Sequence, residues 1–240
     1  MIPIALPLTS TGPEDFRVRV AAERREKMRN RLLDAVLELY QPGAGLHLVI
    51  DDVIRVADVS RGTFYKYFDS LEQAVDALGE QMAEAMIRDF RQLFDGESDA
   101  AVRAIGGAAM TMVRAWHDPR WAGFTCRIDY VDYFARTSTF DSLVRTALKA
   151  ARDADQMAFG SLDVAVDLIV GMTVEARRRL MRQPQAPRAY MDELLTCTFG
   201  GLGMHPEPLS KAKAAAWNRI LAGRPDLDWW TSSRDLAFNG

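Results

Sequence analysis

The sequence predicts an all-α fold, and three observations support this prediction. Apolar side chains recur every three or four residues along most of the 240-residue chain, which is the spacing of one face of a helix. Stretches that contain glycine and proline interrupt this pattern at intervals that suit helices of ordinary length. No stretch alternates apolar and polar residues in the way that a half-buried strand does. Hydrophobic residues make up 48% of the chain and charged residues 26%, which is ordinary for a globular protein with a core.

The N-terminal region is predicted to contain a mobile arm followed by a helix. Residues 1–20 are assigned to the arm. The first helix is expected to run from about Glu23 to Tyr40, and the turn-forming residues Pro42 and Gly43 end it.

Basic side chains are concentrated in this region, although the whole chain carries a net charge of −3. Between Arg17 and Arg31 the basic residues far outnumber the two acidic ones, Glu23 and Glu26. A solvated helix face is one explanation of such a run. Its position directly before the next motif favours contact with the phosphates of a nucleic acid instead.

Residues 47–72 have the layout of a helix-turn-helix. A short first helix carries Val53, Ile54 and Ala57 on its inner side, and a tight turn follows at Asp58. Aspartate tolerates the left-handed backbone conformation of such a turn better than most residues do. The spacing therefore predicts two helices that cross at this turn.

The second helix of the motif is predicted to present a DNA-reading surface. Ser60 has the chemistry of an N-cap, and Phe64 and Phe68 lie four residues apart on one anchoring face. The residues left for DNA contact are Ser60, Arg61, Gly62, Thr63, Tyr65, Lys66 and Tyr67. Because a recognition helix reads bases with its N-terminal residues, Arg61 and Thr63 are expected to contact base edges. The DNA backbone is expected to be contacted and positioned mainly by Ser60, Tyr65, Lys66 and Tyr67.

The string Val-Ser-Arg-Gly-Thr-Phe-Tyr-Lys-Tyr-Phe at residues 59–68 resembles the signature of the TetR family of bacterial regulators. The resemblance covers roughly residues 24–75. It implies an N-terminal three-helix DNA-binding domain followed by a C-terminal helical ligand-binding and dimerisation domain. The sequence departs from the family pattern where Asp58 replaces a turn glycine, where Leu48 and Val49 replace a capping threonine, where Leu71 replaces a phosphate-binding lysine, and where Ala74 replaces a packed leucine.

The remaining helices follow from the same periodicity and from capping residues. Asp69 and Glu72 have capping-box spacing and begin a long helix that reaches about Phe94. The next helix is expected to begin after Ser98 and to include Trp116. Later helices are expected over about 119–134, 139–151, 162–181, 188–202 and 209–221. The predicted organisation is an arm at 1–20, a DNA-binding domain at 21–72, a ligand-binding and dimerisation domain at 73–223, and a tail at 224–240.

The segment 162–181 is predicted to contribute to a dimer interface. Its residues 164–174 are apolar on nearly every side, and a helix of that kind must be buried on both faces. Pairing it and the segment 188–202 with their symmetry mates gives an isologous four-helix bundle, which the resemblance also implies. The predicted interface residues are Leu168, Met172, Leu194, Leu195 and Thr198. A central core helix in a monomer is the alternative.

The middle of the chain is rich in aromatic and methionine side chains, which suits an adaptable apolar pocket. Each of these residues taken alone is more simply explained as part of the core. As a group, and with the resemblance, they predict a ligand pocket lined by Met110, Trp116, Trp121, Phe124 and Tyr133.

An enzyme is not indicated, since the three histidines are isolated and the chain lacks a phosphate-binding glycine loop and a nucleophile elbow. Cys126 and Cys197 fit no metal or redox spacing, and no cofactor or metal is expected. The apolar opening residues do not form a signal peptide, and no run has transmembrane length.

These features predict a cytoplasmic, homodimeric regulator that binds a palindromic operator in double-stranded DNA. The expected role is a repressor that a small hydrophobic or aromatic effector releases. The alternative is a helical bundle that binds a ligand or a protein partner without DNA. The sequence identifies neither the operator nor the effector, and it does not distinguish repression from activation.

Overall fold

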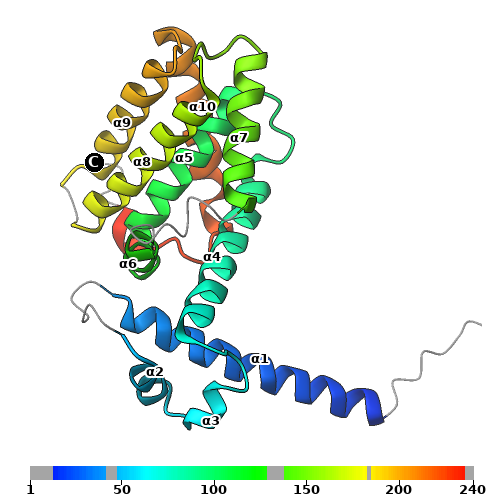
Figure 1. Cartoon of the computed structure of the whole chain (residues 1–240). Coiled ribbons are helices and arrows are strands. Elements are labelled where there is room, and N and C mark those ends of the chain that lie inside the picture. The colour runs from blue at the N-terminus through cyan, green and yellow to red at the C-terminus, as the bar shows by residue number, and fades with distance from the viewer. Residues whose placement is uncertain (1–12, 42–47, 129–137, 183–184, 236–240) are drawn as a thin grey trace, which may run out of the picture. The chain divides into compact units, whose positions relative to one another are not determined.

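The computed structural model describes residues 13–41, 48–128, 138–182 and 185–235, and these residues form helices with no β-strand among them (Figure 1). The predicted all-α class is therefore confirmed. Contacts divide the chain into two compact units. The N-terminal unit contains residues 1–39 and 45–75, and the C-terminal unit contains residues 40–44 and 76–240.

The N-terminal unit is built from three helices and the first turn of a fourth. These are α1 (Pro13–Leu39), α2 (Ile50–Ala57), α3 (Arg61–Phe64) and the beginning of α4 (Leu71–Phe94). The helix α1 packs mainly on α2. The core residues of this unit are Leu32, Leu33, Val36, Val53, Phe64, Phe68 and Ala74. The two anchoring phenylalanines are thus buried as predicted, and Ala74 packs in the core despite its small size.

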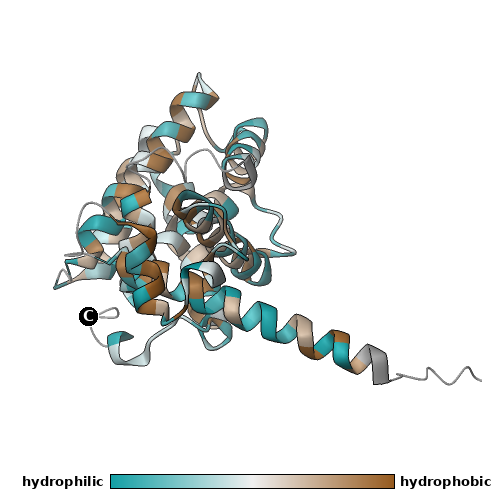
Figure 2. Ribbon diagram, turned by 60° about the horizontal axis from the view of Figure 1, so that its bottom comes forward, coloured by the Kyte–Doolittle hydropathy of each residue, from teal (hydrophilic) through white to brown (hydrophobic). Residues whose placement is uncertain are grey.

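The first helix begins ten residues earlier than expected. The sequence predicts a mobile arm over residues 13–20, but α1 starts at Pro13. The physical reason is that no glycine or proline occurs between Glu14 and Gln41, and proline is tolerated in the first turn of a helix. Figure 2 shows that hydrophilic and hydrophobic residues alternate along this helix. The rest of the expected arm, residues 1–12, lies outside the described residues.

The C-terminal unit is organised around α5 (Ala100–His117). The surrounding helices are the later part of α4, α6 (Pro119–Ile128), α7 (Ser138–Asp153), α8 (Leu162–Met181), α9 (Pro187–Gly201) and α10 (Pro206–Gly223). Asp99 caps α5, because its Oδ1 accepts hydrogen bonds from the amides of Ala101 (2.9 Å) and Val102 (3.2 Å). Nearly every residue of α5 is buried, so this helix is the centre of the core.

Residues 227–235, within the segment predicted as a C-terminal tail, form a C-terminal strap that contacts α4 and α5. The Trp229 indole donates to Asp89 Oδ2 of α4 (2.7 Å). The Thr231 hydroxyl donates to the His117 carbonyl oxygen at the end of α5 (2.9 Å), and the Trp230 ring stacks on the His117 ring with centroids 4.0 Å apart. Two adjacent tryptophans supply enough apolar surface to dock such a short segment. Residues 236–240 lie outside the described residues.

Candidate DNA-binding surface and ligand cavity

The turn of the helix-turn-helix is held in a left-handed conformation. Asp58 has φ +49° and ψ +58°, the region for which the family pattern uses glycine. Arg31 of α1 donates from Nη2 to the Asp58 carbonyl oxygen (3.2 Å) and contacts its Oδ2 (3.3 Å). The aspartate therefore fits the turn, and α1 steadies it.

The start of α2 is capped without the hydroxyl that the family pattern supplies. The Val49 amide donates to Asp52 Oδ2 (3.3 Å), so a side chain one turn inside the helix satisfies the amide of the N-cap residue. The Arg55 guanidinium, which donates to Asp52 Oδ1 (2.6 Å), and the Val49 amide both lower the pKa of this carboxyl. Asp52 is thus kept charged at the positive end of the helix.

The recognition helix α3 is capped as predicted but is short. Ser60 Oγ accepts from the Thr63 amide (3.1 Å) and lies 2.9 Å from the Thr63 hydroxyl. The helix ends at Phe64, and hydrogen-bonded turns continue to Phe68, whose amide donates to the Phe64 carbonyl (3.1 Å). These turns keep both phenylalanines in the core of the N-terminal unit.

The side chains predicted to contact DNA lie on the outer side of this motif. Ser60, Arg61, Gly62, Tyr65 and Lys66 are exposed, whereas Thr63 and Tyr67 are half-buried. All seven lie within or directly beside α3.

Arg61 has a partner that the sequence did not reveal. Its Nη2 lies 2.8 Å from Asp51 Oδ1, and both side chains remain more than half exposed. The predicted base reader is therefore oriented by an acidic residue of α2.

A groove runs between α1 and the recognition motif. It is lined by Phe16, Arg17, Val20, Ala21, Arg24, Arg25, Met28, Thr63, Lys66 and Tyr67. The arginines of α1 thus share one surface with three residues of the predicted DNA-reading set. Sequence reasoning did not place Phe16 and Val20 here, because it started the helix at Glu23.

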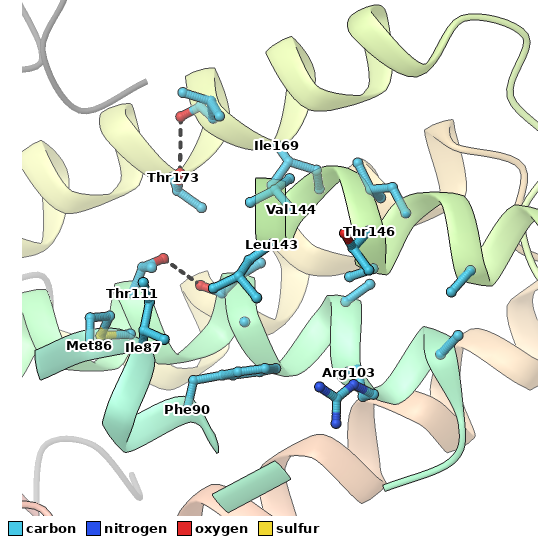
Figure 3. Close-up of a pocket in the computed structure, with 18 residues that line it drawn as sticks. Met86, Ile87, Phe90, Arg103, Thr111, Leu143, Val144, Thr146, Ile169 and Thr173 are labelled. Carbon is cyan, nitrogen blue, oxygen red and sulfur yellow. Dashed lines mark hydrogen bonds between the residues drawn. The ribbon is translucent and has the colours of Figure 1, made fainter. Parts of the chain in front are cut away.

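The C-terminal unit contains a cavity of about 150 Å³ between α4, α5, α7 and α8 (Figure 3). We call it the central cavity. Its walls are mainly apolar, and they include Met86, Ile87 and Phe90 of α4; Ala104, Gly107 and Ala108 of α5; Leu143, Val144 and Leu148 of α7; and Ile169 and Val170 of α8. The polar side chains at this cavity are Arg103, Thr111, Thr146 and Thr173.

The five predicted pocket residues are not among those that line the central cavity. Met110, Trp116, Trp121 and Phe124 are buried in the core, and Tyr133 lies outside the described residues. Trp116 lies about 140° round α5 from Thr111, which faces the cavity. Large side chains fill space, so a segment rich in aromatic and methionine residues forms part of the packed core here and not the wall of a cavity.

Two buried arginines explain what the tryptophan-rich region does. The guanidinium groups of Arg114 and Arg177 lie 5.2 Å and 5.5 Å from the Trp121 ring centroid. Arg114 Nη1 also lies 3.5 Å from Asp89 Oδ2. Burial lowers the pKa of Arg114, and the nearby carboxylates of Asp118 and Asp89 oppose this shift. Trp121 thus covers buried cations by cation–π contacts.

The predicted interface residues fall into two groups. Leu168 is 42% exposed, and Met172 and Leu194 are half-buried, so these three are accessible on α8 and α9. Leu195 and Thr198 are buried in the core of their own unit and do not face outward. The reason is the helical register, which turns these two positions of α9 inward.

The exposed side of α8 nevertheless carries large apolar side chains, which lie beside charged ones such as Asp167. Val164 is 66% exposed and lies one turn before Leu168. A Cβ atom added at Gly171 of α8, or at Gly200 or Gly201 of α9, would meet nothing within 4 Å. This surface has room for another helix to approach closely.

None of the described helices combines the length and apolar composition needed to cross a membrane. Among the described residues, no group of three or more histidine, cysteine, aspartate or glutamate side chains is placed to hold a metal ion.

Comparisons with known proteins give structural matches only. No family profile matches the sequence, and no curated protein matches it. The structure of RolR in complex with its ligand resorcinol is 19% identical, has a TM-score of 0.58, and is matched over 81% of this chain and 95% of that one. RolR without ligand gives 18% identity and a TM-score of 0.54 over 78% and 95% of the two chains.

A gamma-butyrolactone receptor described as an ArpA-like protein is 14% identical, with a TM-score of 0.57 over 83% of this chain and 98% of that one. At identities this low, the structural similarity shows the fold alone. The matches span nearly the whole length of the solved proteins, so they include both the helix-turn-helix and the helical body. The chain therefore has the fold of TetR-family regulators, as its motif at residues 59–68 indicated.

Proposed function

We propose that this chain is a ligand-responsive transcriptional regulator that acts in the cytoplasm as a homodimeric repressor. The observation that carries the proposal is the presence, in one chain, of an exposed and capped recognition helix and of a separate apolar cavity. A surface for DNA and a chamber for a small molecule are the two parts that a ligand-controlled DNA-binding protein needs.

The DNA-binding role rests on the chemistry of α3. Arg61 offers a guanidinium for a bidentate contact with guanine, and Thr63 offers a hydroxyl to either kind of base pair. Ser60, Tyr65, Lys66 and Tyr67 supply donors for phosphates, and Gly62 lets the duplex approach closely. The arginines of α1 that line the groove beside α3 add phosphate contacts that do not depend on sequence.

This role is tested with a pair of variants. Arg61→Ala should weaken operator binding by about 1–3 kcal/mol and relax the sequence preference. Lys66→Ala should weaken all sequences about equally and reduce the salt dependence of binding. If Arg61→Ala leaves both affinity and preference unchanged, α3 does not read the operator. A protein whose affinity for generic duplex DNA stays negligible even at low salt would instead be a helical bundle without a DNA role.

The ligand role rests on the walls of the central cavity. Three of the residues that line it, Met86, Ile87 and Phe90, belong to α4. This helix begins in the N-terminal unit at Leu71. A ligand that prefers one position of α4 can change the population of DNA-binding states, whereas a ligand with equal affinity for both shifts nothing. The structure of RolR with resorcinol is evidence that this fold accommodates a small ring compound, and a small hydrophobic or aromatic effector is proposed here.

The dimer rests on the exposed apolar side of α8. Val164 and Leu168 face outward, and the neighbouring glycines of α8 and α9 leave space for a partner helix. Two copies that meet through α8 and α9 form a symmetric interface. A symmetric dimer presents two helix-turn-helix motifs related by a two-fold axis. These match an operator with two symmetric half-sites, so a palindromic operator is proposed.

A further inference from the structure

We propose that the central cavity selects a small apolar molecule that carries a hydrogen-bond donor, such as the hydroxyl group of phenol. The inference rests on the proposed function, in which this cavity holds the effector. It adds the chemical class of that effector, and it excludes ethers and carboxylates of the same size as good ligands.

The size of the cavity limits the ligand to about one ring. Its volume is about 150 Å³. An apolar cavity of about this volume, lined by leucine, isoleucine and phenylalanine, holds one benzene molecule. The walls here are of the same kind, since Ile87, Phe90, Leu143 and Ile169 contribute to them. An apolar compound of about one ring therefore fits this volume.

Two threonines at the cavity have committed their protons to the protein. Thr111 Oγ1 donates to the Ala108 carbonyl oxygen of α5 (2.8 Å), and Thr173 Oγ1 donates to the Val170 carbonyl oxygen of α8 (3.0 Å). A hydroxyl group has one proton and two acceptor lone pairs. Both side chains therefore offer only acceptors to the cavity.

These acceptors are buried and lie at the same end of the cavity. Thr111 is 5% exposed and Thr173 is 6% exposed. In Figure 3 both are drawn at one end, on the two facing helices α5 and α8. An apolar or ether ligand would cover these oxygens without pairing them, and a buried acceptor without a partner is penalised. A hydroxyl on the ligand donates to one of them and removes this penalty.

The only charged side chain at the described cavity walls lies elsewhere and is already engaged. Arg103 precedes Thr111 by eight residues of α5, a separation of roughly 12 Å along a helix. Its Nη1 donates to the Phe94 carbonyl oxygen (2.6 Å), and its guanidinium lies 5.5 Å from the Phe90 ring centroid. Arg103 is half-buried and positions the Phe90 wall. A carboxylate at the threonine end would meet only acceptor oxygens, which repel it.

The test is a calorimetric comparison of three probes of similar size on the full-length protein: phenol, anisole and benzoate. Phenol has a hydroxyl donor, anisole replaces it with a methyl ether, and benzoate carries a negative charge. We expect phenol to bind about five- to tenfold more tightly than anisole, which is the difference that one hydrogen bond makes. Benzoate should bind more weakly than phenol.

Variants locate the preference. Thr111→Val combined with Thr173→Val should bring phenol and anisole to equal affinity, whereas Thr111→Ser keeps the hydroxyl and should keep the preference. Thr125→Val is the matched control, because Thr125 is a buried threonine of α6 whose hydroxyl also bonds a carbonyl three residues earlier, away from the cavity. Its preference should equal that of the wild type.

Three results would overturn the inference: equal or tighter binding of anisole, tightest binding of benzoate, or no binding of any probe. Operator binding by the same preparation is measured in parallel. If DNA binding is intact and any of these results is found, the proposed donor preference is wrong, but the proposed DNA-binding role is not affected. Selective binding of the donor probe without DNA affinity would instead support the proposed ligand preference and contradict the proposed regulatory function.

Discussion

Arg61, which is proposed to contact DNA bases, forms an ion pair with Asp51. The two side chains meet at 2.8 Å on the exposed surface of the helix-turn-helix. Exposed pairs of this kind contribute about 0–1 kcal/mol, so DNA can displace the carboxylate readily. The sequence placed Asp51 at a helix start, where it complements the dipole. The pairing depends on how α2 and α3 cross, which residue spacing alone does not determine.

Replacing Asp51 with asparagine should strengthen DNA binding. The substitution releases Arg61 and removes a negative charge beside the phosphates, so affinity should rise about two- to fivefold for all sequences, in line with the small energy of an exposed pair. Fluorescence anisotropy with operator and with random duplex measures this gain. Glu38→Gln is the control, because it removes an exposed carboxylate near the far end of α1. A loss of affinity in Asp51→Asn would mean that Asp51 itself positions Arg61 for base contact.

At the scale of elements, features that depend on residues close in sequence were predictable, whereas the covering of a helix by distant helices was not. The Ser60 cap and the Phe64 and Phe68 anchors depend on residues within one or two turns of each other, and the structure confirms them. The all-round apolar pattern of α8 predicted a helix covered on both faces, yet Val164 and Leu168 are exposed in this chain. The helix that its own chain covers almost completely is α5, and this depends on which neighbours pack around it.

Small side chains on α5 determine where the central cavity lies. The sequence predicts that Met110, Trp116, Trp121 and Phe124 line it, but these residues are buried in the core, where the Trp121 ring lies against two buried arginines. The cavity lies where Ala104, Gly107 and Ala108 of α5 face Phe90 of α4. A run of small residues on one helix face leaves unfilled volume, and only the facing helix decides whether that volume is closed.

Two adjacent glycines of α5 should respond in opposite ways to alanine. A Cβ at Gly106 would overlap the fully buried Phe94 ring, so Gly106→Ala should lower the free energy of unfolding by about 1–3 kcal/mol through overpacking. A Cβ at Gly107 would lie 3.7 Å from the Phe90 ring, an ordinary contact. Gly107→Ala should therefore be stabilising by up to about 1 kcal/mol, because alanine favours the helix.

Urea unfolding measures both variants, and a titration with phenol adds a second readout. Gly107→Ala narrows the central cavity, so its ligand affinity should fall although its stability does not. Equal stability of the two variants would show that the Phe94 ring moves aside without cost.

At the scale of the whole molecule, the exposed side of α8 should determine assembly. Leu168→Glu places a charge at the centre of the proposed α8 and α9 interface, where a partner would have to desolvate it. We expect monomers in sedimentation equilibrium at micromolar concentration, with weak operator binding because one monomer contacts one half-site. Ala214→Glu, at an exposed position of α10, is the control and should remain dimeric. A wild-type monomer under these conditions would contradict the proposed dimer.

The C-terminal strap gives the C-terminal unit a specific sensitivity to acid. His117 is buried under Trp230, and the Thr231 amide donates to its Nδ1 (3.1 Å). Burial lowers the pKa of His117 to about 4, against the opposing attraction of Asp235. The neutral imidazole is therefore the form that the fold accepts, while the unfolded chain takes up the proton near pH 6.5.

Stability of the C-terminal unit should consequently fall as the pH decreases from about 6.5 towards 4, and it should be insensitive to this group above that range. Between pH 7 and pH 5 the loss amounts to about 2 kcal/mol, because the unfolded state binds a proton that the folded state excludes. All five tryptophans, at positions 116, 121, 217, 229 and 230, belong to this unit, so their fluorescence during urea unfolding reports on it selectively. His117→Asn retains an acceptor near Nδ1 but does not titrate. Its stability should change by about 2 kcal/mol less than that of the wild type over the same pH interval, and an equal change in both proteins would show that His117 is not the group responsible.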